Sequence, residues 1–313
     1  MDKSTPRWNS FTTLPHPWLQ AFLEKTYAVD PPVMDGPTLY LASDYGGVAK
    51  KSRYSVIGLV AVDIENSKPW ELLRRMVRER YLHDKRRMAF KDLNDSRRWQ
   101  ALIPFLEASD CLTGICVAIA IDKRIRHLCS SAEVLQGLVR TQHLVGKWTP
   151  SSFETMMRVV TFISVFIAGL CKPGQNVYWI TDHDDFTATP QRMEDTRRML
   201  GIFTGMFVNW QLGELGFGTT QLDEGDRFEE DLVSIPDLVA GSVAETITAL
   251  LSRYGTMGNI DLLVPKVASK AETIMDWFCE SGMPLKRIGY VFQQHPGGKF
   301  NLGTWKIEET HVV

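Results

Sequence analysis

Cysteine is scarce in this sequence, and its spacing excludes two common uses of the residue. The five cysteines include no Cys-x-x-Cys pair and are odd in number. A complete set of intramolecular disulfides and a zinc site with the usual ligand spacing are therefore both excluded. We expect free, inert thiols in a reducing compartment, which predicts a cytoplasmic protein.

Long hydrophobic runs and a strong net charge are also missing. The N-terminus, Met-Asp-Lys-Ser-Thr-Pro-Arg, lacks the apolar core of a secretory signal. The longest apolar stretch, residues 159–170, is too short to span a bilayer and predicts a buried core helix, so no membrane partner is expected. The formal net charge of −2 excludes a globally basic nucleic-acid binder but not a local basic patch.

Several catalytic signatures are absent as well. The sequence has no Walker loop, no Gly-x-Ser-x-Gly elbow and no His-Glu-x-x-His motif. His83, His127 and His143 are scattered and are expected to be structural. What remains is a chain of 313 residues with 44% hydrophobic content, which is enough for one large domain or two small ones.

The hydrophobic patterns predict a mixed α/β domain. Two β-rich runs, 37–44 and 53–62, flank a glycine-bearing loop and indicate an antiparallel hairpin. Parallel strands and helices follow, so we expect a mixed sheet flanked by helices. We divide the chain into an irregular N-terminal arm (1–36), a main domain (37–253) and a C-terminal α/β extension packed on the same domain (254–313). The expected helices are 69–82, 95–108, 131–145, 151–171, 189–200, 237–253 and 269–281, and the further strands are 112–121, 176–181, 214–220, 288–292 and 305–307.

Three aspartates stand at the ends of these expected elements. Asp44 and Asp182 each close an apolar strand, and Asp237 opens a helix. Carboxylates from separate elements converge only at a cost in mutual repulsion, unless cations lie between them. A Mg²⁺ or Mn²⁺ site is therefore the leading functional hypothesis. The alternative is that Asp44 is a turn acid and Asp237 a helix-start acid that favours the helix dipole.

The order of elements and acids resembles the ribonuclease H-like fold. More closely, the chain is similar over about residues 37–253 to a family of mostly uncharacterised bacterial proteins of this fold. Their first strand ends in Asp-Glu-Ser-Gly, where this sequence has Asp44-Tyr-Gly-Gly47. The other matching motifs are Phe90-Lys91, the strand that ends at Lys123, the acid after the fourth strand at Asp182, and Pro236-Asp-Leu-Val-Ala-Gly241.

The resemblance implies a metal-dependent nuclease, or a related phosphodiester-processing enzyme, that acts on RNA or DNA. Sites of this kind hold two divalent ions that activate a water and stabilise the leaving oxygen. Asp44, Asp182 and Asp237 would be catalytic metal ligands, with Asp185 as a further ligand and Lys91 as a catalytic lysine. These roles come from the resemblance and not from spacing alone.

One departure from the family pattern supports an alternative function. The family's glutamate is Tyr45 here, so one carboxylate of the expected set is missing or supplied elsewhere, and His183, Asp184 and Asp185 are the candidates to compensate for it. Asp184 and Asp185 are also typical of a solvated turn. The alternative is a catalytically degenerate nucleic-acid- or protein-binding module, for which mobile-element or antiviral defence is a plausible setting.

A basic region provides candidate contacts for nucleic acid. Between Arg74 and Arg98 there are ten Lys or Arg residues against four Asp or Glu. Arg86, Arg87 and Arg98, together with Lys123, are predicted to bind the phosphate backbone, with aromatic rings nearby for stacking. The alternative is an ordinary solvated helix face. The C-terminal extension is a second candidate contact, for a protein partner or a homo-oligomer.

Overall fold

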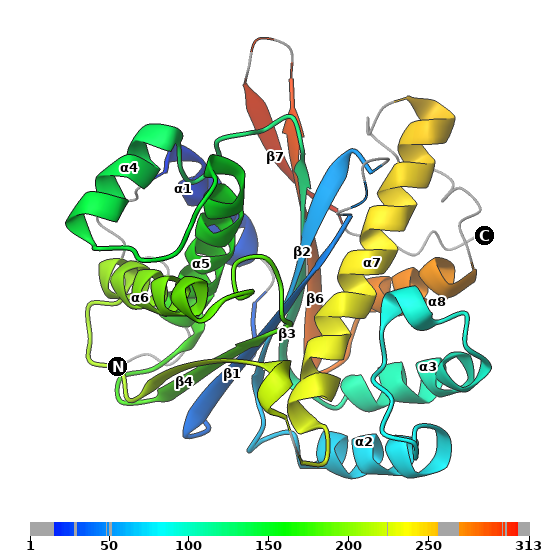
Figure 1. Cartoon of the computed structure of the whole chain (residues 1–313). Coiled ribbons are helices and arrows are strands. Elements are labelled where there is room, and N and C mark those ends of the chain that lie inside the picture. Colours follow the sequence, from blue (N-terminus) through cyan, green and yellow to red (C-terminus); the bar gives the residue numbers. More distant parts are fainter. Residues whose placement is uncertain are drawn as a thin grey trace.

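The computed structural model describes residues 16–27, 30–47, 49, 52–223, 225–255, 269–295, 297 and 299–305. In this part of the chain a central sheet has helices on both faces, which gives three layers (Figure 1). The elements, in chain order, are α1 (Pro17–Tyr27), β1 (Thr38–Gly46), β2 (Tyr54–Asp63), α2 (Lys68–Tyr81), η2 (Phe90–Asp92), α3 (Ser96–Ser109), β3 (Thr113–Asp122), α4 (Ala132–Thr141), α5 (Pro150–Leu170), β4 (Asn176–Thr181), α6 (Pro190–Phe207), β5 (Leu215–Thr219), η3 (Thr220–Leu222), α7 (Phe228–Tyr254), α8 (Ser269–Cys279), β6 (Leu285–Gln294) and β7 (Phe300–Trp305).

The sheet is mixed, as the sequence predicts. Its seven strands run in the order β5-β4-β1-β2-β3-β6-β7. β1, β2 and β3 form an antiparallel meander, β4 lies parallel to β1, and β5 lies parallel to β4. This arrangement, with an antiparallel hairpin and parallel strands flanked by helices, confirms the predicted mixed α/β sheet. β6 and β7 continue the same sheet beyond β3.

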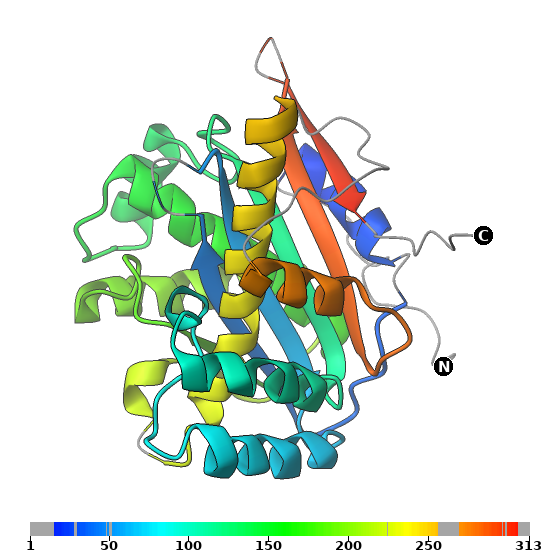
Figure 2. The same ribbon diagram turned by 90° about the vertical axis from the view of Figure 1, so that its right-hand side faces the viewer.

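The two faces of the sheet have separate hydrophobic cores. Helices α1, α4, α5 and α6 cover one face, and Figure 2 shows α7 with α2, α3 and α8 over the other. Successive strand residues point to opposite faces. In β1, Leu39 and Leu41 lie in the core under α5, whereas Ala42 lies in the core under α7. The same alternation places Asp44 on the α7 face.

Helices α5 and α7 are long and apolar. Both satisfy the length and composition of a membrane span, but 78% and 72% of their apolar windows are buried inside the protein. They are the core helices of the two outer layers. The predicted helix 151–171 and its buried stretch 159–170 are confirmed by α5, whose start is fixed by a capping box between Thr149 and Ser152.

The N-terminal segment differs from its prediction. The interpretation of residues 1–36 as an irregular arm is wrong for α1, which buries Trp18, Leu19 and Phe22 against the sheet. Proline-rich composition concealed this helix, although Pro17 stands at its first position, where no backbone donor is needed. Residues 1–15 of the arm and 256–268 of the extension lie outside the described residues.

One further helix differs from its prediction, and another has exposed apolar residues. α7 begins at Phe228, so Asp237 is its tenth residue, and the prediction that Asp237 opens a helix is wrong. Pro236 suggested a helix start, but it lies inside the helix. In α3 the apolar residues do not all face the core, because Trp99 and Ile103 are 40% and 55% exposed while Phe105 is buried.

Helix α7 lies directly on the backbone of β1 and β2. A Cβ atom on Gly58 would lie 2.2 Å from the carbonyl oxygen of Pro236, and one on Gly46 would lie 2.3 Å from that of Ala240. Carbon and oxygen atoms do not approach this closely, so only glycine fits at both strand positions unless the helix moves. The short distance between helix and sheet allows a short side chain on α7 to reach the end of β1.

Candidate functional site

Asp44 lies near the end of β1 with its carboxylate on the α7 face. The backbone amide of Tyr45 donates to Asp44 Oδ1 at 2.6 Å. Oδ2 is buried and has no hydrogen-bond partner in the described part of the chain. Burial, followed by the nearby charge of Asp237, raises the pKa of Asp44 well above its ordinary value. An incompletely paired carboxylate of this kind costs stability unless a cation accompanies it.

Asp182 follows β4 at the same edge of the sheet. β4 runs parallel beside β1, so the carboxyl ends of the two strands meet. Asp182 Oδ1 accepts from the His183 amide at 2.9 Å and from Thr220 Oγ1 at 3.0 Å. Its Oδ2 accepts from Arg87 Nη2 at 2.9 Å. Burial opposes ionisation, but Arg87 and these hydrogen bonds lower the pKa of Asp182 overall.

Asp237 reaches the same place from α7. Its Oδ2 accepts from the backbone amide of Phe90 at 2.6 Å. Burial raises the pKa of Asp237, although the Phe90 amide and the charges of Arg87 and Lys91 favour the charged form. Lys91 itself is exposed at the surface of η2. Asp44, Asp182 and Asp237 therefore lie together, while their catalytic roles remain predictions.

The motif from Pro236 to Gly241 has a physical explanation. The Pro236 and Ala240 carbonyl groups lie over the two strand glycines, and Asp237 faces the site between them. A Cβ on Gly241 would lie 2.3 Å from the ring of Phe90, so the ring packs directly on the helix backbone. The small residues in this motif let α7 pack close to the sheet and to Phe90. Asp237 reaches the site because the helix lies this close.

Asp184, and not Asp185, is the additional acid near these three. Asp184 Oδ2 is buried without a hydrogen-bond partner among the described residues. Burial, followed by the charge of Asp182, raises the pKa of Asp184 to about 6. Asp185 is 66% exposed and its carboxylate pairs with Arg192 of α6 at 2.5 Å. The prediction of Asp185 as a ligand is therefore not supported by its position. We call Asp44, Asp182, Asp184 and Asp237 the acid cluster.

The local turn explains which of the two acids faces inward. The Asp184 amide donates to Thr187 Oγ1 at 2.8 Å, and the Thr187 amide donates back to the Asp184 carbonyl at 2.9 Å. This closed turn fixes Asp184 toward the cluster. The Asp-His-Asp-Asp sequence suggested more than one acid here, but a linear sequence does not show which one the turn selects.

Arg87 is the cation nearest to the acid cluster in the described chain. Its Nη2 atom lies 2.9 Å from Asp182 Oδ2 and 3.8 Å from Asp44 Oδ2. Both oxygens are measured from one nitrogen, so Asp44 and Asp182 are close neighbours. The sequence placed Arg87 on a nucleic-acid-binding surface and gave no sign of this inward contact.

The other predicted nucleic-acid contacts are partly neutralised. Arg86 pairs with Asp84 at 2.5 Å and with Asp95 at 2.6 Å. Arg98 lies 3.7 Å from Asp92 and donates from Nε to the Arg87 carbonyl at 2.8 Å. The local excess of positive charge is therefore smaller than the sequence count indicates.

Lys123 lies apart from these arginines. It follows the end of β3, and its Nζ donates to the Ala49 carbonyl in the β1–β2 connection at 2.9 Å. β3 runs in the same direction as β1, because both are antiparallel to β2. Lys123 therefore lies at the same edge of the sheet as the acid cluster.

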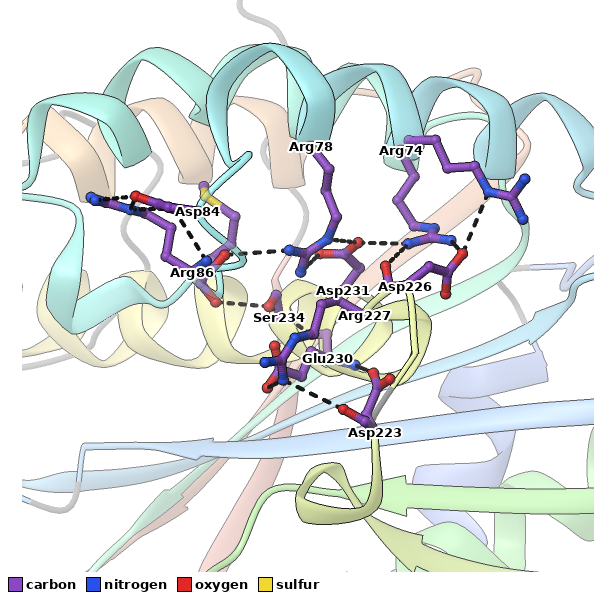
Figure 3. Close-up of polar contacts among 12 residues, drawn as sticks. Arg74, Arg78, Asp84, Arg86, Asp223, Asp226, Arg227, Glu230, Asp231 and Ser234 are labelled. Carbon is purple, nitrogen blue, oxygen red and sulfur yellow. Dashed lines mark hydrogen bonds and ion pairs between the residues drawn. The ribbon is translucent and has the colours of Figure 1, made fainter.

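A buried ionic network connects helix α7 with helix α2 (Figure 3). Asp231 of α7 is 0% exposed and accepts from Arg74 at 3.0 Å and from Arg78 at 2.6 and 2.7 Å. Ser234 Oγ donates to the Met88 carbonyl at 2.7 Å. These contacts join α2 and the segment that carries Arg87 to helix α7.

Tyr45 is not a replacement ligand. Its hydroxyl exchanges hydrogen bonds with Ser43 Oγ at 2.8 Å and Thr181 Oγ1 at 3.2 Å, and its ring packs edge-on to Phe186. Burial raises the pKa of Tyr45 well above its ordinary value, so the phenol stays neutral. The residue at the position of the family's glutamate is therefore part of the core on the other face.

The acids do not surround one common point. Among the described residues, no three Asp, Glu, His or Cys side chains are placed to hold one metal ion together. The guanidinium of Arg87 lies beside Asp44 and Asp182 instead. All five cysteines are free thiols, as the sequence predicts.

Comparisons with known proteins do not assign this chain to a family. No protein-family model matches the sequence, and no curated protein matches it. Among solved structures, the chain is similar to ribonuclease H2 from Pyrococcus horikoshii OT3, with a TM-score of 0.37 and 11% sequence identity over 80% of this chain and 92% of that chain.

Proposed function

We propose that this protein is a divalent-metal-dependent nuclease, or a related phosphodiester-processing enzyme, that acts on RNA or DNA. One observation carries the proposal: two carboxylate oxygens of the acid cluster, Asp44 Oδ2 and Asp184 Oδ2, are buried without hydrogen-bond partners in the described chain. Buried unpaired carboxylates are costly, and such groups concentrate at functional sites. A hard divalent cation is the ligand that they suit best.

The donor set fits Mg²⁺ or Mn²⁺ chemically. Mg²⁺ keeps several waters and is commonly bound through one or two carboxylates plus substrate phosphates, so it does not need three converging acids. Asp44 would hold the ion with Asp182 or Asp237. When bound, such an ion supplies an activated water and stabilises the leaving oxygen.

The chain's own residues orient these acids. The Phe90 amide fixes Asp237, and Thr220 with the His183 amide fixes Asp182. Lys91 is exposed and its charge acts on Asp237, and we propose that its ammonium holds a substrate phosphate as a point charge. Arg86, Arg98 and Lys123 are proposed to contact the nucleic-acid backbone.

We also propose kinship with the bacterial family whose first strand ends in Asp-Glu-Ser-Gly. Support comes from two of its motifs, which pack on each other: Phe90 lies on Gly241, and its amide binds Asp237. This contact requires both motifs, so it accounts for their occurrence together in the sequence.

A second candidate function has its own support. Tyr45 occupies the place of a family carboxylate, and a guanidinium contacts Asp44 and Asp182. Both features favour a catalytically degenerate module that binds nucleic acid or protein.

Manganese binding and cleavage together distinguish the two functions. Protein stripped with EDTA is titrated with Mn²⁺ and the free ion is followed by electron paramagnetic resonance. Asp35→Asn is a matched control, because Asp35 is 67% exposed, pairs with Lys172 and precedes β1 at its opposite end. We expect wild type and Asp35→Asn to bind Mn²⁺ and Asp44→Asn to lose it.

The same three proteins are then assayed for cleavage of labelled single- and double-stranded RNA and DNA in Mn²⁺. Asp44-dependent cleavage supports the nuclease. Nucleic-acid binding without cleavage by wild type supports the degenerate module. Absence of Mn²⁺ binding in wild type contradicts the metal-dependent enzyme.

A further inference from the structure

The side chain of Arg87 makes few polar contacts for a cation that lies in an acid cluster. It contacts Asp182 through Nη2 alone at 2.9 Å and Asp44 at a longer 3.8 Å. Its Nε atom is buried and has no partner in the described part of the chain. The side chain is 27% exposed, so a path to solvent exists.

Arg78 shows what a fully engaged arginine looks like in the same molecule. It binds Asp231 through Nε at 2.6 Å and Nη2 at 2.7 Å, which is the two-pronged pairing of a guanidinium with a carboxylate. Its side chain is 11% exposed. Arg87 makes one such contact and leaves a second donor unused, so its ion pair is the weaker of the two.

The backbone around Arg87 is fixed on both sides. Arg98 Nε donates to the Arg87 carbonyl at 2.8 Å, and Ser234 Oγ donates to the Met88 carbonyl at 2.7 Å. The Arg78 guanidinium reaches the Arg86 carbonyl at 3.4 Å (Figure 3). Because the main chain is anchored, any movement of the Arg87 cation takes place by rotation of its side chain.

A guanidinium and a divalent ion are both attracted to the carboxylates of Asp44 and Asp182. The two cations repel each other, so placing both beside Asp44 Oδ2 and Asp182 Oδ2 costs electrostatic free energy. Without a metal, the positive charge of Arg87 compensates the negative charges of Asp44 and Asp182. With a metal bound, Arg87 and the metal would both compensate the same two charges. If the metal replaces Arg87, each carboxylate is still paired with one cation.

We propose that Arg87 is a resident cation that compensates Asp44 and Asp182 in the metal-free protein and is displaced from them when a divalent metal binds. The inference rests on the proposed function and adds a form of regulation to it. Metal binding has to break an internal ion pair, so Arg87 raises the metal concentration at which the site fills.

The test compares Arg87→Gln with Arg197→Gln. Glutamine keeps polarity and most of the length but removes the charge, and Arg197 is a matched control because its side chain is 63% exposed on α6. Mn²⁺ binding to EDTA-stripped protein is measured by electron paramagnetic resonance. We expect roughly tenfold tighter binding for Arg87→Gln, which corresponds to a lost ion pair of about 1.4 kcal/mol.

A thermal melt in EDTA gives a second readout. Arg87→Gln is expected to melt at a lower temperature than wild type and to gain more from Mn²⁺, while Arg197→Gln follows wild type in both. Arg87→Lys keeps the charge and is expected to return the Mn²⁺ affinity toward the wild-type value. Equal or weaker Mn²⁺ binding by Arg87→Gln would overturn the inference.

A crystal structure of the wild-type protein with Mn²⁺ tests displacement without any mutation. We expect the ion at Asp44 and Asp182 and the Arg87 guanidinium away from both. A bound ion with Arg87 still on Asp182 would overturn this inference and leave the proposed metal site intact. Failure of every variant to bind Mn²⁺ would overturn the proposed function and this inference together.

Discussion

Replacement of Asp44 by Asn should stabilise the metal-free protein while it removes metal binding. Asp44 is 6% exposed, and its Oδ2 has no hydrogen-bond partner in the described chain. Asn keeps the acceptor for the Tyr45 amide, because its carbonyl oxygen takes the place of Asp44 Oδ1. Its NH₂ group replaces a repelled carboxylate oxygen with a donor near Asp237. What the substitution removes is a long ion pair with Arg87 at 3.8 Å.

The sign of the effect follows from the raised pKa of Asp44. A carboxyl group whose pKa is higher in the folded than in the unfolded state stabilises the fold below its unfolded pKa of about 3.9. That contribution is lost as the pH rises, so near neutral pH Asp44 lowers the free energy of unfolding. We expect Asp44→Asn to recover about 1–2 kcal/mol there, and nothing below about pH 4.

Urea denaturation in EDTA measures this directly, at acidic and at neutral pH. For 313 residues the unfolding entropy is large, so a gain of about 1.5 kcal/mol moves the melting temperature by only about 2 °C. Chemical denaturation is therefore the better assay. A mutant that is less stable than wild type at neutral pH would refute the reasoning, because Asp44 would then be a net stabilising group.

Three further predictions concern the surroundings of the site. Asp184→Asn should flatten the fall in stability between about pH 4 and pH 6 by about 1–2 kcal/mol, because the pKa of Asp184 is raised to about 6 and its stabilising contribution is lost as the pH rises through that value; identical pH profiles in urea denaturation would contradict this. Asp231→Ala should cost about 3–5 kcal/mol of unfolding free energy, because it leaves Arg74 (1% exposed) and Arg78 without their shared carboxylate; a loss below about 1 kcal/mol would show that the network is not structural. Replacing Arg86, Arg98 and Lys123 with Ala should weaken nucleic-acid binding and lower its salt slope by about one counterion for each phosphate that the protein no longer neutralises; unchanged affinity and slope would show that these three residues do not contact nucleic acid.

Local signals in the sequence predicted much of the sheet. The strand at 176–181 and the cap at Thr189 before Pro190 agree with β4 and α6 because strand apolarity and capping chemistry act over a few residues. The order of elements was enough to predict a mixed α/β sheet. The predicted helix 237–253 is shorter than α7, which begins at Phe228. In the sequence Pro236 resembles a helix start, and the packing of the surrounding helix on the strands cannot be read from local signals.

The candidate site was predictable only in part. Asp44 and Asp182 could be placed at one edge because parallel strands end together. The inward turn of Asp184 depends on Thr187, and the inward direction of Arg87 depends on a segment anchored to α7. Contacts between residues far apart in the chain decide both, and neither leaves a periodic signal in the sequence.

The contact of α7 with Gly46 and Gly58 has a consequence for genetics. A methyl group at either position would collide with a helix carbonyl group and push α7, with Asp237, away from Asp44. In a saturation mutagenesis screen these two positions should therefore tolerate as few substitutions as the acids do, although glycine has no functional group to contribute. Loss-of-function alleles would identify them as essential residues, and what they contribute is the space that their missing side chains leave.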